Sequence, residues 1–307
     1  MNGARHPKKS DGLLRQAQRV RFIFIDREKA VFPVCVLCRA LGVTRSGYYA
    51  WRIRPLSART QRDRELTTQL RIAHAESRRT YGRPRLQQAL RARGFRVGDK
   101  RLRRLMRSAD LTARGRRRFR VTTDSAHANP VVPNHLARGF NVTMPNTVWA
   151  ADVTAFWTRE GWCFLAVVLD LASRRVVGWA IRSTLDTALV LAALHLALGR
   201  RRLRAGAIHH SDRGRPYTSA AYQQALARHG LIGSMSRVGD CWDNAPVESF
   251  FSHLKAEVQP ERPWLTRAAA HVALADHLEA FYNRRRLHSA LAYQSPADFE
   301  AEYGAAV

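Results

Sequence analysis

Cysteine, long apolar runs and acidic residues are all scarce in this sequence of 307 residues. Four cysteines are too few for a disulfide scaffold. Cys35 and Cys38 have the C-x2-C spacing of zinc ligands, but they lie in an apolar helical run and no second such pair follows, so buried helix packing is favoured over a metal site. The longest apolar run, 188–199, is too short to span a bilayer, and the basic N-terminus has no signal-peptide core behind it. These shortages predict a soluble, intracellular protein.

The shortage of acidic residues leaves a large excess of positive charge. The chain has 52 lysines and arginines against 24 aspartates and glutamates, a formal net charge of +28. Residues 1–140 hold 34 basic and 9 acidic residues, a net charge of +25, whereas residues 141–307 hold 18 and 15, a net charge of +3. A basic surface displaces counterions from nucleic acid, although a merely solvated basic surface is the alternative. We therefore expect two domains, of which the first binds DNA and the second, nearly neutral one carries an acidic site.

The first sixty residues (1–60) contain a helix-turn-helix pattern. Apolar residues recur at helical spacing from Val34 to Leu41, Gly42 ends this helix, and Thr44 or Ser46 caps the next one. Such an arrangement is typical of DNA-binding domains, and a plain helical hairpin is the alternative. The second helix would present three basic residues to DNA, Arg45, Arg52 and Arg54.

Residues 61–112 predict a second basic helical region of the same kind. A polar helix over 62–79 is followed by a helix with Leu86 and Leu90 on one stripe, and then by a helix that begins at a cap on Asp99. The side chains between the apolar positions are almost all basic, which suits contact with the phosphate backbone better than a simply solvated face. The candidate DNA contacts of this region are Arg83, Arg85, Lys100, Arg101 and Arg104.

Residues 113–146 predict a basic linker between the two halves. A run from Arg114 to Arg120 is followed by a stretch rich in proline, asparagine and serine with little periodicity. We expect this linker to lie along DNA and to contact it through Arg116, Arg117 and Arg118.

Residues 147–265 change to an alternating pattern of strands and helices. Three β-type runs, 147–158, 162–173 and 174–184, are each separated by one turn, and an apolar helix from Asp186 to Gly199 follows. A fourth strand at 207–210, a helix at 219–229, a short strand at 231–236 and a helix at 245–258 complete the series. This element order predicts a ribonuclease-H-like α/β core, a five-stranded mixed sheet with flanking helices, preceded by an all-α region.

Three acids in this core form a candidate metal site. Asp152 lies within the first strand, Asp212 follows the fourth, and Glu248 lies on the last helix. Since the first and fourth strands are neighbours in such a sheet, the three carboxylates would meet and repel one another unless a cation lies between them. Oxygen ligands of this type favour Mg²⁺ or Mn²⁺, and two such ions suit phosphodiester displacement. The alternative is that each acid is an ordinary surface carboxylate.

Several neighbours extend the candidate site. Lys255 lies two helical turns after Glu248, and Asn244 lies one turn before it, so both are placed to contact DNA close to the metal. For His209 and His210, packing or hydrogen bonding is favoured over metal ligation. Residues 266–307 predict a helix capped by Thr266 and then a basic cluster near the site, with candidate DNA contacts at Arg284 and Arg285 beside Arg286 and His288. A solvated helix terminus is the alternative for this cluster.

Four motifs resemble a known family. These are HSDRG at 210–214, YTS at 217–219, DNAPVESFFSHLKAE at 243–257 and YNRRRLHSAL at 282–291, which are similar to the integrase core of the bacterial insertion-sequence transposases of the IS-three class. Upstream, LCRALGVTRSGYYAW and YGRPRL resemble the helical region that precedes this core. The resemblance covers about residues 24–299 and implies that Asp152, Asp212 and Glu248 are an Asp-Asp-Glu catalytic triad, with Lys255 in contact with DNA.

The resemblance also implies an activity and partners. It implies Mg²⁺-dependent strand cleavage at the ends of a mobile element, joining of the freed 3′-hydroxyl to another strand, a homo-oligomer on double-stranded DNA and a bacterial, nucleoid-associated location. The chain departs from the family at Arg215-Pro216, where small or amide side chains are usual, and an upstream reading frame would supply a further helix-turn-helix partner. Two other functions remain open, a catalytically inert DNA-binding regulator and a ribonuclease-H-like nuclease acting on RNA–DNA hybrids.

Overall fold

The structure, a computed structural model, describes residues 17–114, 132–237 and 241–305. The chain divides into two compact units, Met1–Leu66 and Thr67–Val307, which are described separately. The predicted linker contacts Arg116, Arg117 and Arg118 lie outside the described residues. Among the residues that are described, no helix is both long enough and apolar enough to cross a membrane.

Three short helices make up the core of the first unit. They are α2 (Gln18–Glu28), α3 (Val34–Ala40) and α4 (Arg45–Ile53). Gly42 has the φ of +60° that ends α3 and starts the turn, and Thr44 caps α4 by accepting a hydrogen bond from the backbone of Gly47 at 3.1 Å. The predicted helix, turn and capped second helix are therefore confirmed, whereas α2 was not predicted. Arg54 follows the last residue of α4 instead of lying within the helix.

The helices α5 (Ala58–Glu76), α6 (Arg83–Ala92) and α7 (Asp99–Ser108) follow, and the division between the two units falls within α5. The predicted stripes of α6 and α7 are confirmed, because Leu86, Leu90 and Leu102 have no exposed surface. The predicted cap at Asp99 was wrong by one residue. Gly98 is the N-cap, and Asp99 lies in the first turn, where its carboxylate pairs with Arg83.

The second unit contains the predicted five-stranded mixed sheet. Its strands are β1 (Val148–Thr158), β2 (Gly161–Asp170), β3 (Val176–Arg182), β4 (Ile208–Ser211) and β5 (Ile232–Met235), in the order β3-β2-β1-β4-β5. β1, β2 and β3 are antiparallel neighbours, whereas β4 pairs in parallel with both β1 and β5. This order confirms that the first and fourth strands lie side by side and that the fold is of the ribonuclease-H type.

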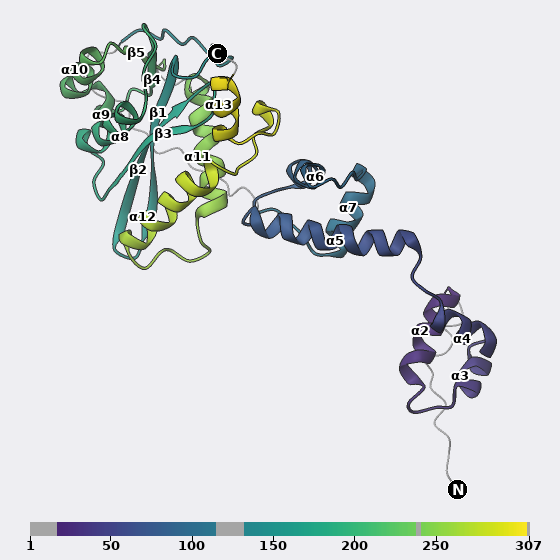
Figure 1. The fold of residues 1–307 in the computed structure, drawn as a ribbon. Coiled ribbons are helices and arrows are strands. Elements are labelled where there is room, and N and C mark those ends of the chain that lie inside the picture. The colour runs from purple at the N-terminus through teal and green to yellow at the C-terminus, as the bar shows by residue number, and fades with distance from the viewer. Residues whose placement is uncertain (1–16, 115–131, 238–240, 306–307) are drawn as a thin grey trace. The chain divides into compact units, whose positions relative to one another are not determined.

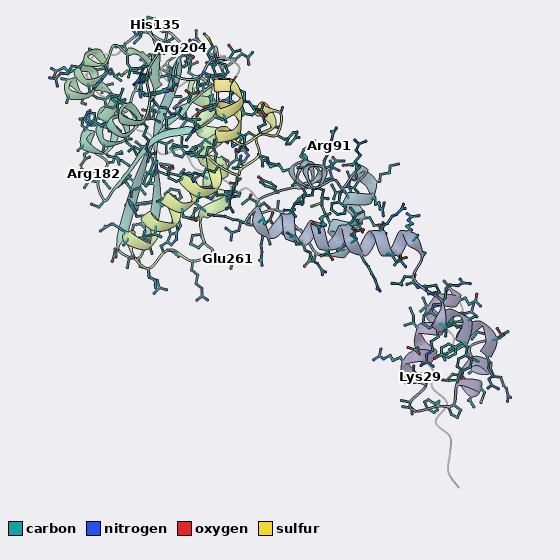
Figure 2. All side chains as sticks on the ribbon, in the orientation of Figure 1. Lys29, Arg91, His135, Arg182, Arg204 and Glu261 are labelled. Atoms are coloured by element: carbon teal, nitrogen blue, oxygen red, sulfur yellow. The ribbon has the colours of Figure 1, made fainter. Side chains whose placement is uncertain are left out.

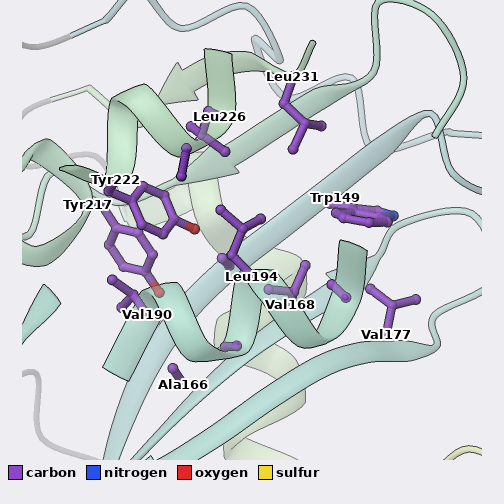
Figure 3. Packing of buried hydrophobic residues seen from close by; sticks show 14 of the residues in the cluster. Trp149, Ala166, Val168, Val177, Val190, Leu194, Tyr217, Tyr222, Leu226 and Leu231 are labelled. Atoms are coloured by element: carbon purple, nitrogen blue, oxygen red, sulfur yellow. The ribbon is translucent and has the colours of Figure 1, made fainter. Parts of the chain in front are cut away.

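Helices cover both faces of the sheet (Figure 1). On one face, α8 (Thr187–Arg200) and α10 (Ala220–Arg228) pack over a core that includes Trp149, Val168, Leu194 and Tyr222, shown in Figure 3. On the other face, α11 (Ala245–Val258) and α12 (Arg267–Asp276) cover residues such as Leu165. Because β1 alternates its side chains between these two cores, both faces of the central strand are buried.

Two helical segments differ from the prediction. Arg215-Pro216 begins a one-turn helix, α9 (Arg215–Thr218), where only a loop was expected, and the proline occupies a position that needs no hydrogen-bond donor. The predicted helix from Thr266 to Tyr282 is capped by Thr266 as expected, but it continues after α12 as a π-helix, His277–Tyr282. Helix α13 (Pro296–Ala305) ends the described chain.

Gly178 on β3 gives a test of how closely α8 packs on the sheet. A Cβ atom at this position would overlap the carbonyl oxygen of Ala193 and lie 2.8 Å from the backbone nitrogen of Ala197, and neither backbone group can move alone. We expect Gly178→Ala to lower the free energy of unfolding by about 3 kcal/mol in urea denaturation.

Gly199, on the same helix, is the matched control. A Cβ atom there has nothing within 4 Å, so Gly199→Ala should be neutral or should stabilise the protein by up to about 0.5 kcal/mol. Equal effects of the two substitutions would show that α8 does not approach β3 this closely.

Candidate active site

The first acid, Asp152, lies near the middle of the central strand β1. The side chains of Trp149 and Ala151 pack into the core beneath α8, whereas those of Ala150 and Phe156 pack into the core beneath α11. Asp152 lies at an even position, as Ala150 and Phe156 do, so its carboxylate is on the α11 side. The sheet therefore directs this acid toward the helix that carries Glu248.

The second acid, Asp212, comes directly after β4. Ala150 on β1 is the partner of His210 on β4, so two residues further along each parallel strand Asp152 and Asp212 are neighbours. An Asp212 oxygen, Oδ1, accepts a hydrogen bond from the backbone nitrogen of Gly214 at 2.9 Å, and a Cβ atom on Gly214 would lie 3.0 Å from that oxygen. Glycine at this position therefore lets the backbone approach the acid closely.

Helix α11 carries the third acid and the lysine. Glu248 lies in its first turn and is exposed, and Lys255 lies two turns later and is partly buried. The Nζ atom of Lys255 is 5.8 Å from the ring centroid of Phe156, which follows Asp152 by four residues on the same face of β1. The lysine thus reaches back over the strand that carries the first acid.

The charges of these four side chains act on one another. Burial raises the pKa of Asp152 well above its ordinary value, and the negative charges of Asp212 and Glu248 raise it further. A hydrogen bond from the backbone of Val153, at 2.7 Å, and the positive charge of Lys255 oppose that rise only in part. Burial lowers the pKa of Lys255 to about 8 against the opposing effect of Asp152. The site is therefore an acidic cluster beside the partly buried cation of Lys255.

A carboxylate outside the triad, Asp243, holds the loop that leads into α11, and no role was predicted for it from the sequence. The side chain of Asp243 is fully buried and accepts hydrogen bonds from the backbone and guanidinium of Arg237 at 3.0–3.1 Å, from Arg138 at 3.1 Å and from Asn134 at 2.9 Å. The hydrogen bonds from Arg237 are the main reason that the pKa of Asp243 lies far below its usual range. Because α11 starts two residues later, this cluster fixes the position of Glu248.

Comparisons with known proteins identify the family. The chain matches two integrase core domain models over residues 142–241 and 229–296, and an HTH-like domain model over residues 61–119. It is 40% identical over 283 residues to the transposase InsF of insertion sequence IS3A from Escherichia coli, with 92% of this chain and 98% of that protein covered. The chain belongs to the transposase family of IS3-type insertion sequences.

Other relatives extend the same comparison. A 31 kDa protein of insertion element IS600 from Shigella sonnei is 42% identical over 267 residues, with 87% of this transposase chain and 98% of that protein covered. Among solved structures, a simian T-cell lymphotropic virus intasome covers 69% of each chain at 16% identity and a TM-score of 0.42. The catalytic core of HTLV-2 integrase, in complex with magnesium, covers 51% of this chain and 97% of its own at 15% identity and a TM-score of 0.40.

The predicted DNA contacts of this transposase fall into two groups by exposure. Arg83 pairs with Asp99 and is partly buried, and Arg85 donates a hydrogen bond to the carbonyl of Leu287. Arg101 is also partly buried. The exposed members are Arg45, Lys100, Arg104, Arg284 and Arg285. Contact with DNA stays a prediction for both groups.

Several neighbours of the acids are buried. The Nδ2 atom of Asn244 donates to the carbonyl of Ala151 at 3.4 Å, and this side chain is only 4% exposed, so its predicted contact with DNA stays a prediction. His209 and His210 are buried and lie within hydrogen-bond distance of Tyr222 and Ser234, as the packing interpretation expected. In the basic cluster after residue 283, Arg286 is buried, whereas the two predicted DNA contacts, Arg284 and Arg285, are exposed.

The donor atoms fit a hard divalent cation. Within 17–114, 132–237 and 241–305, no three histidine, cysteine or acidic side chains are already gathered as a complete ligand set. Asp152 and Asp212 nevertheless offer carboxylate oxygens from adjacent strands, which are the ligands that Mg²⁺ prefers. The Oδ1 atom of Asn244 is buried without a hydrogen-bond partner, and a water molecule of a hydrated ion would satisfy it.

The raised pKa of Asp152 predicts the effect of its removal on stability. Without a divalent cation, this partly buried carboxylate is repelled by its acidic neighbours and destabilises the fold, so Asp152→Asn should raise the free energy of unfolding at pH 7 by about 1 kcal/mol in the presence of a chelator. Chemical denaturation measures this change.

Asp170 is the matched control, because it is an acid whose pKa is likewise raised by desolvation. Its carboxylate accepts backbone hydrogen bonds from Asn146, Ala172 and Ser173, and an amide can replace only part of this set. Asp170→Asn should therefore destabilise the protein by about 2 kcal/mol. Destabilisation by both substitutions would argue against repulsion at Asp152.

Proposed function

We propose that this chain catalyses DNA strand cleavage and strand transfer at the ends of an insertion sequence, with Asp152, Asp212 and Glu248 as its catalytic residues. The observation that supports the proposal best is the placement of three acids on β1, at the end of β4 and on α11, where Asp212 and Glu248 both raise the pKa of Asp152, within a chain of the IS3 transposase family. No comparison favours an inert regulator or a nuclease acting on RNA–DNA hybrids.

The same three side chains would hold one or two divalent cations, Mg²⁺ or Mn²⁺. When bound, these ions would lower the repulsion among the acids and stabilise negative charge on the attacked phosphodiester. The protein supplies the placement: β1 and β4 set the spacing of Asp152 and Asp212, and the Asp243 cluster sets Glu248. Lys255 supplies a partly buried positive charge for a DNA phosphate.

The reaction would consist of two displacements at phosphorus. Water first attacks the phosphodiester at the element end, a P–O bond to this water forms, and the P–O3′ bond breaks to free a 3′-hydroxyl. This hydroxyl then attacks a phosphodiester of the target, and the target's own P–O3′ bond breaks. Each step exchanges one P–O bond for another, so no external energy source is required.

Partners follow from the same proposal. The exposed basic residues of α4 and α7, Arg45, Lys100 and Arg104, would contact the backbone of double-stranded DNA. Joining two element ends requires at least two copies of the chain, so a homo-oligomer on DNA, associated with the bacterial nucleoid, is part of the proposal. A helix-turn-helix protein from an upstream reading frame would add recognition of the element ends.

Conservative substitutions of the acids test the proposal. Asp152→Asn and Glu248→Gln should each lower strand transfer on element-end duplex DNA by at least about 10³-fold, because a neutral amide cannot replace a carboxylate ligand. Gel-resolved products with Mg²⁺ and with chelator give the rates, and fluorescence anisotropy should show DNA affinity within about threefold of the wild type.

The control for this test is Asp186→Asn, which changes the partly buried N-cap residue of α8, a position that asparagine fills as well as aspartate. It should leave strand transfer within about twofold of the wild type. Unchanged strand transfer by either triad variant would rule out the assigned roles, and equal cleavage of RNA–DNA hybrid and duplex DNA would favour the nuclease instead.

The low pKa of Lys255 predicts a pH dependence. Its ammonium group loses the proton as the pH rises through about 8, so DNA cleavage at limiting DNA concentration should fall above that pH. In Lys255→Arg the side chain stays charged, so the fall should move up to at least about pH 9. A pH profile with the same upper limit in both proteins would show that Lys255 does not set it.

A further inference from the structure

Two sequence motifs that lie about two hundred residues apart meet in the second unit. They are YGRPRL at 81–86 and YNRRRLHSAL at 282–291. Tyr81 is 5% exposed, and its hydroxyl donates a hydrogen bond to the carbonyl of Arg285 at 2.8 Å and accepts one from the backbone nitrogen of Leu287, also at 2.8 Å. One phenol thus satisfies two backbone groups of the same turn, which requires an exact fit.

Arg78 and Arg85, which lie on either side of Tyr81 in the sequence, strengthen this contact. The Nε atom of Arg85 donates to the carbonyl of Leu287 at 2.8 Å, and its guanidinium lies 5.9 Å from the ring centroid of Tyr81. Arg78 pairs with Asp276 at 2.5 Å and lies 5.0 Å from the ring centroid of Phe281. These arginines therefore bind protein, although the basic pattern around them suggested DNA.

The turn at 285–287 is tied in its other direction to the catalytic helix. Arg286 is 3% exposed and donates to the Glu257 carboxylate on the last turn of α11, with N–O distances of 2.6–3.0 Å. The backbone carbonyl of Glu257 accepts a further hydrogen bond from Arg114 at 2.6 Å. His277, on the π-helix, lies 3.4 Å from the same carboxylate. A buried ion pair of this kind is rigid, because separating it would leave a desolvated charge.

Helices α6 and α7 are thereby connected to Glu248 through a short chain of contacts. Tyr81 precedes α6 by two residues, the 285–287 turn contacts both Tyr81 and Glu257, and Glu257 lies on the helix of Glu248. These hydrogen bonds therefore connect the basic helices to the catalytic helix within the second compact unit.

Given the DNA cleavage proposed above, we propose that Tyr81 and Arg85 are positioning residues that determine which phosphodiester is cut. Their docking on the 285–287 turn sets the distance between the DNA held by α6 and α7 and the acids on the sheet. If the contact of Tyr81 and Arg85 with the 285–287 turn were weakened, the same DNA could move relative to the acids. Displacements of about 1 Å at a reacting centre can cost two orders of magnitude in rate. The choice of phosphate, and not the affinity for DNA, is the property that depends on this contact.

The test uses the full chain with Tyr81→Phe alone and with Tyr81→Phe combined with Arg85→Gln. Tyr81→Phe removes a single oxygen atom, so it is retained as the informative variant if the double variant does not fold. Products from a 5′-labelled element-end duplex in Mg²⁺ should spread to phosphates next to the wild-type position. The rate at that position should fall at least about tenfold at saturating DNA.

Arg91→Gln is the matched control. Arg91 is an exposed arginine on α6, labelled in Figure 2, and its replacement removes the same charge as Arg85→Gln. With Arg91→Gln, cleavage should stay at the single wild-type phosphate. The change in DNA affinity should be no larger than that of the double variant. A spread of products in the control as well would assign the effect to lost charge and overturn the proposal.

Hydrogen exchange of the backbone amides at 285–288 gives a readout that does not depend on cleavage. The Leu287 amide should exchange at least about tenfold faster in Tyr81→Phe than in the wild type, because the hydroxyl is its acceptor. Faster exchange of the Leu287 amide with unchanged cleavage position and rate would show that the contact is only structural and would overturn its positioning role. Unchanged exchange would show that Tyr81 does not hold the 285–287 turn.

A wild-type protein that binds but does not cut element-end DNA would contradict the proposed function. That result would also contradict the positioning role of Tyr81 and Arg85. The exchange measurement would still decide whether Tyr81 binds the 285–287 turn.

Discussion

A partly buried carboxylate on the central strand is the constraint on which the catalytic half of this transposase depends. Asp152 lies on β1 between two packed cores, where burial and the charges of Asp212 and Glu248 all oppose its ionised form. A fold that keeps such a group must hold compensating charge close by. Lys255 supplies part of that charge, and the oxygen-rich donor set fits a divalent cation for the remainder.

The helix that completes the site is held at both ends by ion pairs with a buried carboxylate. At its start, Asp243 accepts hydrogen bonds from Arg237 and Arg138, and at its end, Glu257 pairs with Arg286. In the first pair the carboxylate is buried while the arginines remain about half exposed, whereas in the second pair both partners are buried. Such pairs contribute little net stability but define one geometry, because any displacement leaves a buried charge without its partner. Glu248 therefore stands on a helix whose position is determined from outside the triad.

Local patterns predicted the elements well where the physical signal is local. Apolar periodicity located α6 and α7, alternation located β1 to β3, and Thr44 and Thr266 were recognised as caps because capping depends on the neighbouring few residues. Failures arose where the deciding contact is distant in sequence. Nothing in the local pattern separated Arg85, Arg286 and Asp243, which bind other parts of the protein, from exposed charges of the same type. The π-helix at 277–282 likewise depends on packing, and its sequence reads as the continuation of α12.

The sequence by itself determined the order of strands and helices. Because few arrangements of such an order bury every strand, it also determined the sheet topology that makes Asp152 and Asp212 neighbours. Its motifs likewise determined the family. Only the tertiary structure decided which charged residues face inward and which motifs meet. The contact of Tyr81 with the 285–287 turn joins segments about two hundred residues apart, and no local propensity encodes such a pairing. Its physical cause is the requirement that buried hydroxyl, carbonyl and amide groups find partners, which is satisfied only when the whole chain has folded.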